Sequence, residues 1–263
     1  MVNYKQKEHY DLNDFREIIA VLRHPGGCPW DGAQTHQSIR RNLLEEAYEL
    51  AEGIDQENQE LMEEELGDVL MQVLFHASIE EDAGHFDIND VADRACKKLI
   101  FRHPHVFGAV QVEGTGQVLV NWEELKRQEK HQERYTDTLN AVARTLPALW
   151  RAEKIQKKAA KANFTWPDIT GAMEKLREEQ AELAQAVDQG DKAQVAEELG
   201  DLLFAAANVA RFAGVDPEDA LNASCEKFID RFDRLEQSVE GDMAALSLEE
   251  LMARYQQAKE GQP

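Results

Sequence analysis

The sequence is poor in cysteine and in positive charge. It has three cysteines among 263 residues, and 29 Lys and Arg stand against 51 Asp and Glu, for a formal net charge of −22. Cys28, Cys96 and Cys225 lack the spacing of a metal site, and so sparse a set indicates reduced thiols in the cytoplasm. Nucleic acid polymers and anionic membranes are held by basic residues, so the charge argues against both as partners.

Several other sequence features are absent. No apolar stretch is long enough to span a bilayer, and the first fourteen residues have no apolar signal core. The chain has no phosphate-binding loop of the Gly-x-x-x-x-Gly-Lys-Ser/Thr type, and Gly114-Thr115-Gly116 lacks the third glycine of a dinucleotide fingerprint. No histidine follows a glutamate by three positions, which argues against a di-iron bundle.

What the sequence does have is a pair of acidic motifs between Leu176 and Asp201. Glu178-Glu179-x-x-Glu182 is followed by Glu198-x-x-Asp201, and both lie in apolar patterns of helical period. Residues three apart share a helix face, so each motif presents its carboxylates together. Gln189-Gly190-Asp191 predicts a turn between the two helices. Folded back, the pair would gather the carboxylates of Glu179, Glu182, Glu198 and Asp201.

The same arrangement occurs earlier, at an offset of 133 residues. Glu46, Glu49, Glu65 and Asp68 repeat the spacing of the later four acids. Further on, Cys96-Lys97-Lys98 resembles Cys225-Glu226-Lys227 at an offset of 129. An internal duplication is the simplest account. We therefore predict two domains, residues 1–105 and 141–263, joined by a linker at 106–140.

The fold predicted from these patterns is all-α, with two tandem repeats of the four-helix-bundle type. Residues 105–120 lack helical period, and Val118–Val120 is interpreted as a short strand or as loop. The expected helices are 12–22, 39–54, 60–81, 88–101, 122–134, 148–162, a helix capped by Asp168 or Thr170, 197–212, 218–239 and 247–259.

The repeated acids favour a site for divalent cations. Glutamate-rich helices are usually solvated, but here leucine and valine residues are interleaved with the acids, which draws them towards a packed interface. Carboxylate oxygens suit Mg²⁺ or Mn²⁺. Lys227 and Arg231 on a later helix would supply charge for phosphoryl chemistry, unless they only form salt bridges. His103 and His105 flank a proline and are more typical of a helix end than of metal ligands.

At this point the residues resemble a known family. GCPWD, QTH, LLEEAYEL, EELGDVL, RHPHVF, KIQKKA, EELGDLLFAAANVAR and EKFIDRF are similar to motifs of the tandem-domain MazG proteins, over about residues 12 to 234. Thr165 departs from an aspartate that is usual in the family at Phe164-Thr165-Trp166. The resemblance implies hydrolysis of nucleoside triphosphates to monophosphates and pyrophosphate with Mg²⁺, or with Mn²⁺ in its place. It also implies bundle domains that form an intertwined homodimer.

The resemblance also implies particular residues. The metal ligands and catalytic carboxylates would be Glu179, Glu182, Glu198 and Asp201, with Glu46, Glu49, Glu65 and Asp68 as a second site that is inactive if activity belongs to the later repeat. Nucleotide contacts are predicted at Lys175, Glu178, Glu197, Asn208, Lys227, Arg231, Trp166 and Tyr255. Phe164 is a further aromatic near them.

Two alternatives stay open at this stage. The first is a non-catalytic regulator that senses nucleotides or binds partner proteins, because both sets of four acids are intact without an evident need for two active sites. The second is a narrow hydrolase for dUTP or dCTP or for phosphoribosyl-ATP. The sequence specifies neither base nor sugar, nor which repeat is active.

Overall fold

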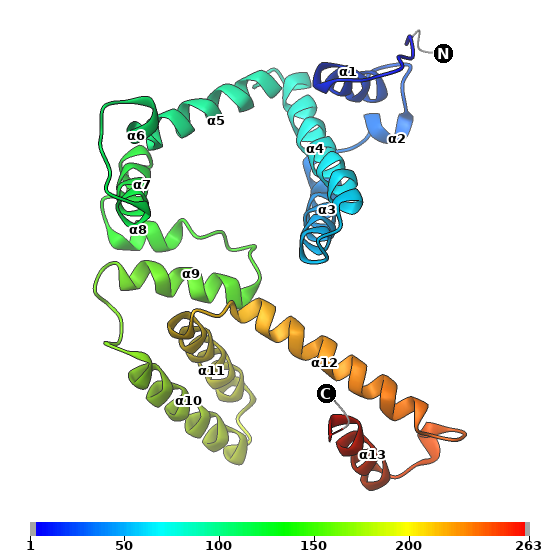
Figure 1. The fold of residues 1–263 in the computed structure, drawn as a ribbon, viewed down its shortest axis with the longest axis vertical. Coiled ribbons are helices and arrows are strands. Elements are labelled where there is room, and N and C mark those ends of the chain that lie inside the picture. The colour runs from blue at the N-terminus through cyan, green and yellow to red at the C-terminus, as the bar shows by residue number, and fades with distance from the viewer. Residues whose placement is uncertain (1–3, 261–263) are drawn as a thin grey trace. The chain divides into compact units, whose positions relative to one another are not determined.

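The computed structural model describes residues 4–260, and the fold over these residues consists of α-helices with no β-strand. This confirms the predicted all-α class with tandem repeats. The helices are α1 Leu12–Arg23, α2 Pro29–Gly32, α3 His36–Asp55, α4 Gln59–Asp82, α5 Ile88–Arg102, α6 Pro104–Phe107, α7 Thr115–Glu129, α8 Tyr135–Asn140, α9 Ala148–Ala160, α10 Ile169–Gln189, α11 Lys192–Ala213, α12 Pro217–Gln237 and α13 Leu248–Glu260, as Figure 1 shows.

The chain divides into two compact units, one ending at Lys126 and one beginning at Arg127. The point of division lies inside α7 and within the segment 106–140 that the sequence predicts as a linker. That segment contains α7, α8 and the end of α6. The domain bounds 1–105 and 141–263 stay a prediction.

Each unit is built on a helical hairpin. In the first unit α3 packs against α4, and in the second α10 packs against α11. Equivalent helices begin 133 residues apart, at His36 and Ile169 and again at Gln59 and Lys192. Gly190 has φ of +70° at the turn after α10, where L-residues with a side chain are strained. The duplication seen in the sequence is thus a duplication of this hairpin.

The two hairpins are covered by different side chains. In the first unit Ile19 of α1 joins Ile39, Leu74 and Phe75 in a buried cluster. In the second unit α9 packs on α11, and the buried apolar residues are mostly small: Ala152, Ala172, Ala186, Ala205 and Ala207. Small side chains leave room between helices, and this unit contains a cavity between its helices.

Several stretches of the chain differ from the sequence-based prediction, since α2, α6 and α8 are not among the expected helices. Residues 118–120 are neither strand nor loop, because α7 begins at Thr115 and includes them. Near the start of α7 the Gln117 side chain accepts the backbone N–H of Glu113. Val118 and Val120 favour strands when a neighbouring strand is there to pair with. In the described part of the chain there is none.

The long helix α12 leaves apolar residues exposed. Leu221, Phe228, Ile229 and Phe232 are each at least 40% exposed, and in Figure 1 this helix runs away from the α10–α11 hairpin of its own unit. The exposed residues do not by themselves show a dimer, so the predicted homodimer stays a prediction.

Within residues 4–260 no helix combines the length and the apolar character needed to cross a membrane.

A chain of polar groups crosses the first hairpin near its open end. The Nδ1 atoms of His36 and His76 are 2.7 Å apart, and the His36 Nε2 is 2.6 Å from one oxygen of Glu80. The Nδ1 of His85 is 2.7 Å from the other oxygen of that carboxylate. Burial and the neighbouring His36 lower the pKa of His76. Hydrogen bonds from His85 and His36 lower the pKa of Glu80.

We expect acidification to weaken the first unit through His76. Unfolded chains take up the His76 proton below about pH 6.5, whereas the folded chain resists it, so stability falls as the pH drops through that value. The thermal unfolding midpoint should fall between pH 7.5 and pH 5.5, and it should fall less in His76→Leu than in the exposed control His9→Leu. Equal falls in the two variants would contradict this assignment.

Candidate functional site

The acids of the second unit converge between α10 and α11. Glu179 and Glu182 come from α10 and Glu198 from α11, and one carboxylate oxygen from each lies within 4.8 Å of the other two. Glu179 is 5% exposed although its side chain is a carboxyl group. Like charges at this separation repel strongly, so the cluster requires protons or cations to balance it. Three of the four acids predicted to converge therefore lie together, while Asp201 lines the neighbouring cavity; their role as metal ligands stays a prediction.

Two features of the cluster reduce this repulsion: the pKa of Glu182 is raised, and a lysine lies beside the acids. A side-chain hydrogen bond with Glu179, together with burial and the charges of Glu179 and Glu198, raises the pKa of Glu182. The Lys175 Nζ lies 2.7 Å from a carboxylate oxygen of Glu178 and 2.7 Å from one of Glu179. These contacts raise the pKa of Lys175, so its ammonium group stays charged at neutral pH.

Beside this cluster lies a cavity of about 500 Å³. Its size falls within the range of small-molecule sites, about 300–1,000 Å³. Glu179 and Asp201 form one part of its wall, and apolar residues from α8, α9 and α11 form another. The lining is Leu139, Ile155, Gln156, Ala159, Asn163, Phe164, Thr165, Trp166, Lys175, Glu179, Asp201, Phe204, Ala205, Asn208 and Arg211. The cavity joins a polar, acidic wall to an apolar one, as a nucleotide requires.

The structure places some of the predicted nucleotide contacts in this cavity and others outside it. Lys175, Asn208 and Trp166 line it, and so does Phe164. Glu178 and Glu197, next to metal-cluster residues in the sequence, are exposed and not in the lining. Lys227 and Arg231 of α12 and Tyr255 of α13 are also outside it, with the Tyr255 ring 5.8 Å from that of Phe228. Their predicted roles stay predictions.

Sequence reasoning assigned no role to several residues that line the cavity. Arg211 donates to Asn208 Oδ1 from its Nε, 3.0 Å away, and to Thr165 Oγ1 from an η nitrogen, 2.8 Å away. Gln156 was likewise missed. It follows Ala152 by four positions and precedes Ala159 by three, so it is a polar residue on the apolar face of α9. A polar side chain on an apolar helix face was the sequence signal that could have identified Gln156 as a residue of the site.

The aromatic side of the cavity depends on a glycine. Asp168 caps α10 by accepting the backbone N–H of Thr170, as predicted for this position. A Cβ at Gly171 would lie 2.9 Å from Cε3 of Trp166, closer than real contacts allow. The missing side chain therefore lets the indole pack directly on the first turn of α10.

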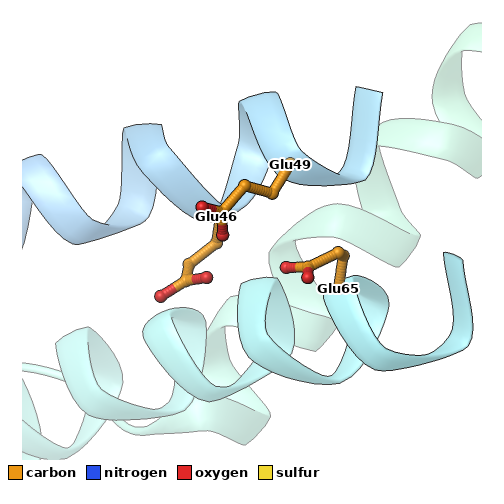
Figure 2. Close-up of side chains that lie close together, drawn as sticks. All are labelled: Glu46, Glu49 and Glu65. Atoms are coloured by element: carbon orange, nitrogen blue, oxygen red, sulfur yellow. The ribbon is translucent and has the colours of Figure 1, made fainter. Parts of the chain in front are cut away.

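The first unit contains a matching acidic cluster. Figure 2 shows Glu46 and Glu49 extending from α3 and Glu65 from α4 into the space between the helices, with ligand oxygens that lie within 4.8 Å of one another. Glu65 is 7% exposed, and its Oε2 is buried without a hydrogen-bond partner. Burial, followed by the charges of Glu49, Asp68 and Glu64, raises the pKa of Glu65. Burial and the charge of Asp68 do the same for Glu46.

Both clusters fit a divalent cation. Each offers at least three carboxylate oxygens from two facing helices, the donors that Mg²⁺ and Mn²⁺ prefer. The buried oxygen of Glu65 without a partner is the kind of atom that a cation would satisfy.

Away from the acids, the two hairpins differ in the side chains that could contact a nucleotide. At an offset of 133, Lys175, Asn208 and Arg211 of the second unit correspond to Asn42, Phe75 and Ser78 of the first. Phe75 is buried in the core cluster of its unit. Arg23 of α1 donates to Ser78 Oγ at 3.0 Å and pairs with Asp82 at 2.8 Å. The first hairpin thus keeps the acids and fills the neighbouring positions with core and ion-pair residues.

Comparison with known proteins agrees with the duplicated hairpin. The family model of the MazG nucleotide pyrophosphohydrolase domain matches residues 34–107 and 169–235. The chain is 42% identical to the nucleoside triphosphate pyrophosphohydrolase/pyrophosphatase MazG of Thermotoga maritima, over 94% of this chain and 96% of that protein. It is 40% identical to the nucleoside triphosphate pyrophosphohydrolase of Escherichia coli K12, over 92% and 94%. It is also 46% identical to the uncharacterized protein YabN of Bacillus subtilis, covering 52% of that longer protein.

Proposed function

Because the chain belongs to the MazG nucleotide pyrophosphohydrolase family, we propose that it hydrolyses nucleoside triphosphates to nucleoside monophosphates and pyrophosphate. The observation that carries this proposal is the second unit's cluster of Glu179, Glu182 and Glu198 beside a cavity large enough for a nucleoside. The names of the relatives from Thermotoga maritima and Escherichia coli agree with it.

In this proposal the four acids of the second hairpin hold Mg²⁺, or Mn²⁺ in its place. When bound, such an ion would supply positive charge for the triphosphate and Lewis acidity for a water molecule. Glu179, Glu182, Glu198 and Asp201 would fix the position of the ion from two sides, because they come from antiparallel neighbours in one hairpin. Glu179 is held in place by its burial in the wall of the cavity.

Other side chains would hold the nucleotide. Lys175 already lies against Glu179, so its ammonium group is placed to contact a phosphate oxygen near the ion. Trp166 and Phe164 offer aromatic surfaces for stacking, and Asn208 a polar contact within the cavity. Glu178 and Glu197 would contact the nucleotide at the edge of the acidic cluster. The apolar wall of the cavity would exclude water from the base.

We also propose a homodimer, in which Lys227, Arg231 and Tyr255 reach a nucleotide. The exposed apolar residues of α12 support it, since a second copy would cover them. Lys227 and Arg231 lie on the same helix, one turn apart, and α13 with Tyr255 packs against that helix. The charge balance and sparse cysteines favour a cytoplasmic protein that binds neither nucleic acid polymers nor membranes.

The second unit is the proposed site of catalysis. The cavity lies there, and Lys175, Asn208 and Arg211 have no chemical counterparts at Asn42, Phe75 and Ser78. The first cluster, with Glu46, Glu49, Glu65 and Asp68, would then hold a cation without turning over a nucleotide.

The test is a panel of ribo- and deoxyribonucleoside triphosphates, together with phosphoribosyl-ATP, incubated with the protein and Mg²⁺, with the products separated by chromatography. We expect monophosphate and pyrophosphate in equal amounts from several bases. Orthophosphate with a nucleoside diphosphate would refute the proposed reaction. Turnover of one pyrimidine triphosphate or of phosphoribosyl-ATP alone would indicate the narrow hydrolase, and metal-dependent binding without product the nucleotide-sensing regulator.

A further inference from the structure

One polar atom in the wall of the cavity has no partner. Gln156 lies on α9 and is 8% exposed, and its Nε2 donates to the backbone carbonyl of Phe204 at 2.7 Å. A carbonyl oxygen only accepts hydrogen bonds, so the amide nitrogen must be the atom that faces it. This contact fixes the orientation of the amide. It leaves Gln156 Oε1 buried and without a hydrogen-bond partner.

The position of this oxygen relative to the acids is set by α11. Phe204 follows Asp201 by three residues, about 4.5 Å of helix rise, towards Asn208 and Arg211. Gln156 therefore lies past the acidic cluster, beside the apolar part of the cavity wall that Ile155, Ala159 and Ala205 provide. A nucleotide whose phosphates lie at the acids would place its base against this wall.

Arg211 already occupies two of the other acceptors that line the cavity. Asn208 Oδ1 accepts from Arg211, and Arg211 also donates to Thr165. Burying an acceptor without a partner costs free energy, so native proteins rarely leave one unless something binds there. Because Gln156 lines the cavity, a ligand bound there is the candidate source of such a donor for its Oε1.

We propose that Gln156 Oε1 accepts a hydrogen bond from an N–H group on the edge of the nucleobase, and that this contact favours bases that carry such a group over a base that lacks one. This inference rests on the proposed function. Because the Gln156 Nε2 donates to the Phe204 carbonyl, only its Oε1 can contact the base, and it can only accept. A free amide, in contrast, can pair with a donor and an acceptor on the base edge at once. Gln156 distinguishes a base with an N–H from a base without one. Adenine, cytosine, guanine, uracil and thymine all carry such a group, so the substrate class is broad.

The decisive substrate pair is ATP and purine ribonucleoside triphosphate, which differ only by the exocyclic amino group. For the wild-type protein with Mg²⁺ we expect kcat/KM for ATP to exceed that for the purine analogue by about tenfold, the effect of one hydrogen bond. In Gln156→Met, which keeps the length of the side chain, the ratio should fall to about one through a loss on ATP alone. The control Gln180→Met, on an exposed position of α10, should keep the wild-type ratio.

Equilibrium binding of the same two nucleotides, with Mg²⁺ present, separates this inference from the proposed function. Pyrophosphate release from both substrates at equal kcat/KM in the wild-type protein would overturn the role of Gln156 and leave the hydrolase in place. Tighter binding of ATP than of the analogue, without product from either, would support Gln156 and overturn the hydrolase. A ratio that persists in Gln156→Met would also overturn the role of Gln156. If that variant does not fold, the wild-type ratio decides alone.

Discussion

Replacing Glu179 by glutamine is expected to lower kcat for pyrophosphate release by about a thousandfold, the scale of losing one preorganised electrostatic contact in an active site. Glu179 is a buried member of the acidic cluster and also lines the cavity, so it joins the proposed metal site to the nucleotide site. Glutamine keeps the shape and removes the charge. Initial rates with ATP at saturating Mg²⁺, with thermal unfolding to verify the fold, are the measurement.

The matched control is Glu46→Gln, the same change at the equivalent position 133 residues earlier. We expect it to retain most of the activity, since the first hairpin has Asn42, Phe75 and Ser78 where the second has Lys175, Asn208 and Arg211. If Glu46→Gln abolished turnover and Glu179→Gln did not, the active site would belong to the first hairpin.

Divalent cations are expected to raise the unfolding temperature of the protein. A variant of Glu65, the buried acid of the first unit, allows the part of this rise that belongs to the first cluster to be measured. A ligand at a hundred times its Kd adds roughly 2.7 kcal/mol of stability. For a unit of this size that corresponds to a rise of roughly 10 °C in Tm. Calorimetry of the metal-free protein with and without Mg²⁺ or Mn²⁺ measures it.

Glu65→Gln should change this response in two ways. Because the folded state raises the pKa of Glu65, ionisation of this group opposes folding as the pH rises above its ordinary pKa in the unfolded chain, so removing the carboxyl group should stabilise the metal-free protein at pH 7.5. The same variant should lose the part of the metal response that belongs to the first unit. Glu63→Gln, at an exposed position of α4, should match the wild type. A full metal response in Glu65→Gln would show that the first cluster holds no cation.

Much of the hairpin geometry was accessible from the sequence because it depends on local spacing. Glu-x-x-Glu and Glu-x-x-Asp fix a common helix face, and a turn signal at Gly190 fixes the reversal, so the meeting of Glu179, Glu182 and Glu198 followed from short-range rules. The turn at Gly190 and the cap at Asp168 were readable for the same reason.

The contacts that the sequence did not reveal join helices far apart in the chain. Gln156 acquires its orientation from Phe204, 48 residues later, and His36 meets His76 across 40 residues. No local pattern encodes such pairs. Residues 118–120 show that a local preference can also mislead. Their side chains favour strands, but the described chain offers no strand to pair with, and they lie in α7.

The ion pair of Lys175 has a consequence for how the two halves of the molecule respond to chelation. In the second hairpin this ammonium group is an internal counter-ion, held 2.7 Å from a Glu179 oxygen, and a metal or a phosphate must compete with it or share it. In the first hairpin Asn42 occupies that position and brings no charge. If each cluster holds a divalent ion as proposed, removing the ions would leave Lys175 beside the acids of the second hairpin and no cation at the equivalent Asn42 of the first, so we expect the amino-terminal half to be the more sensitive to chelation.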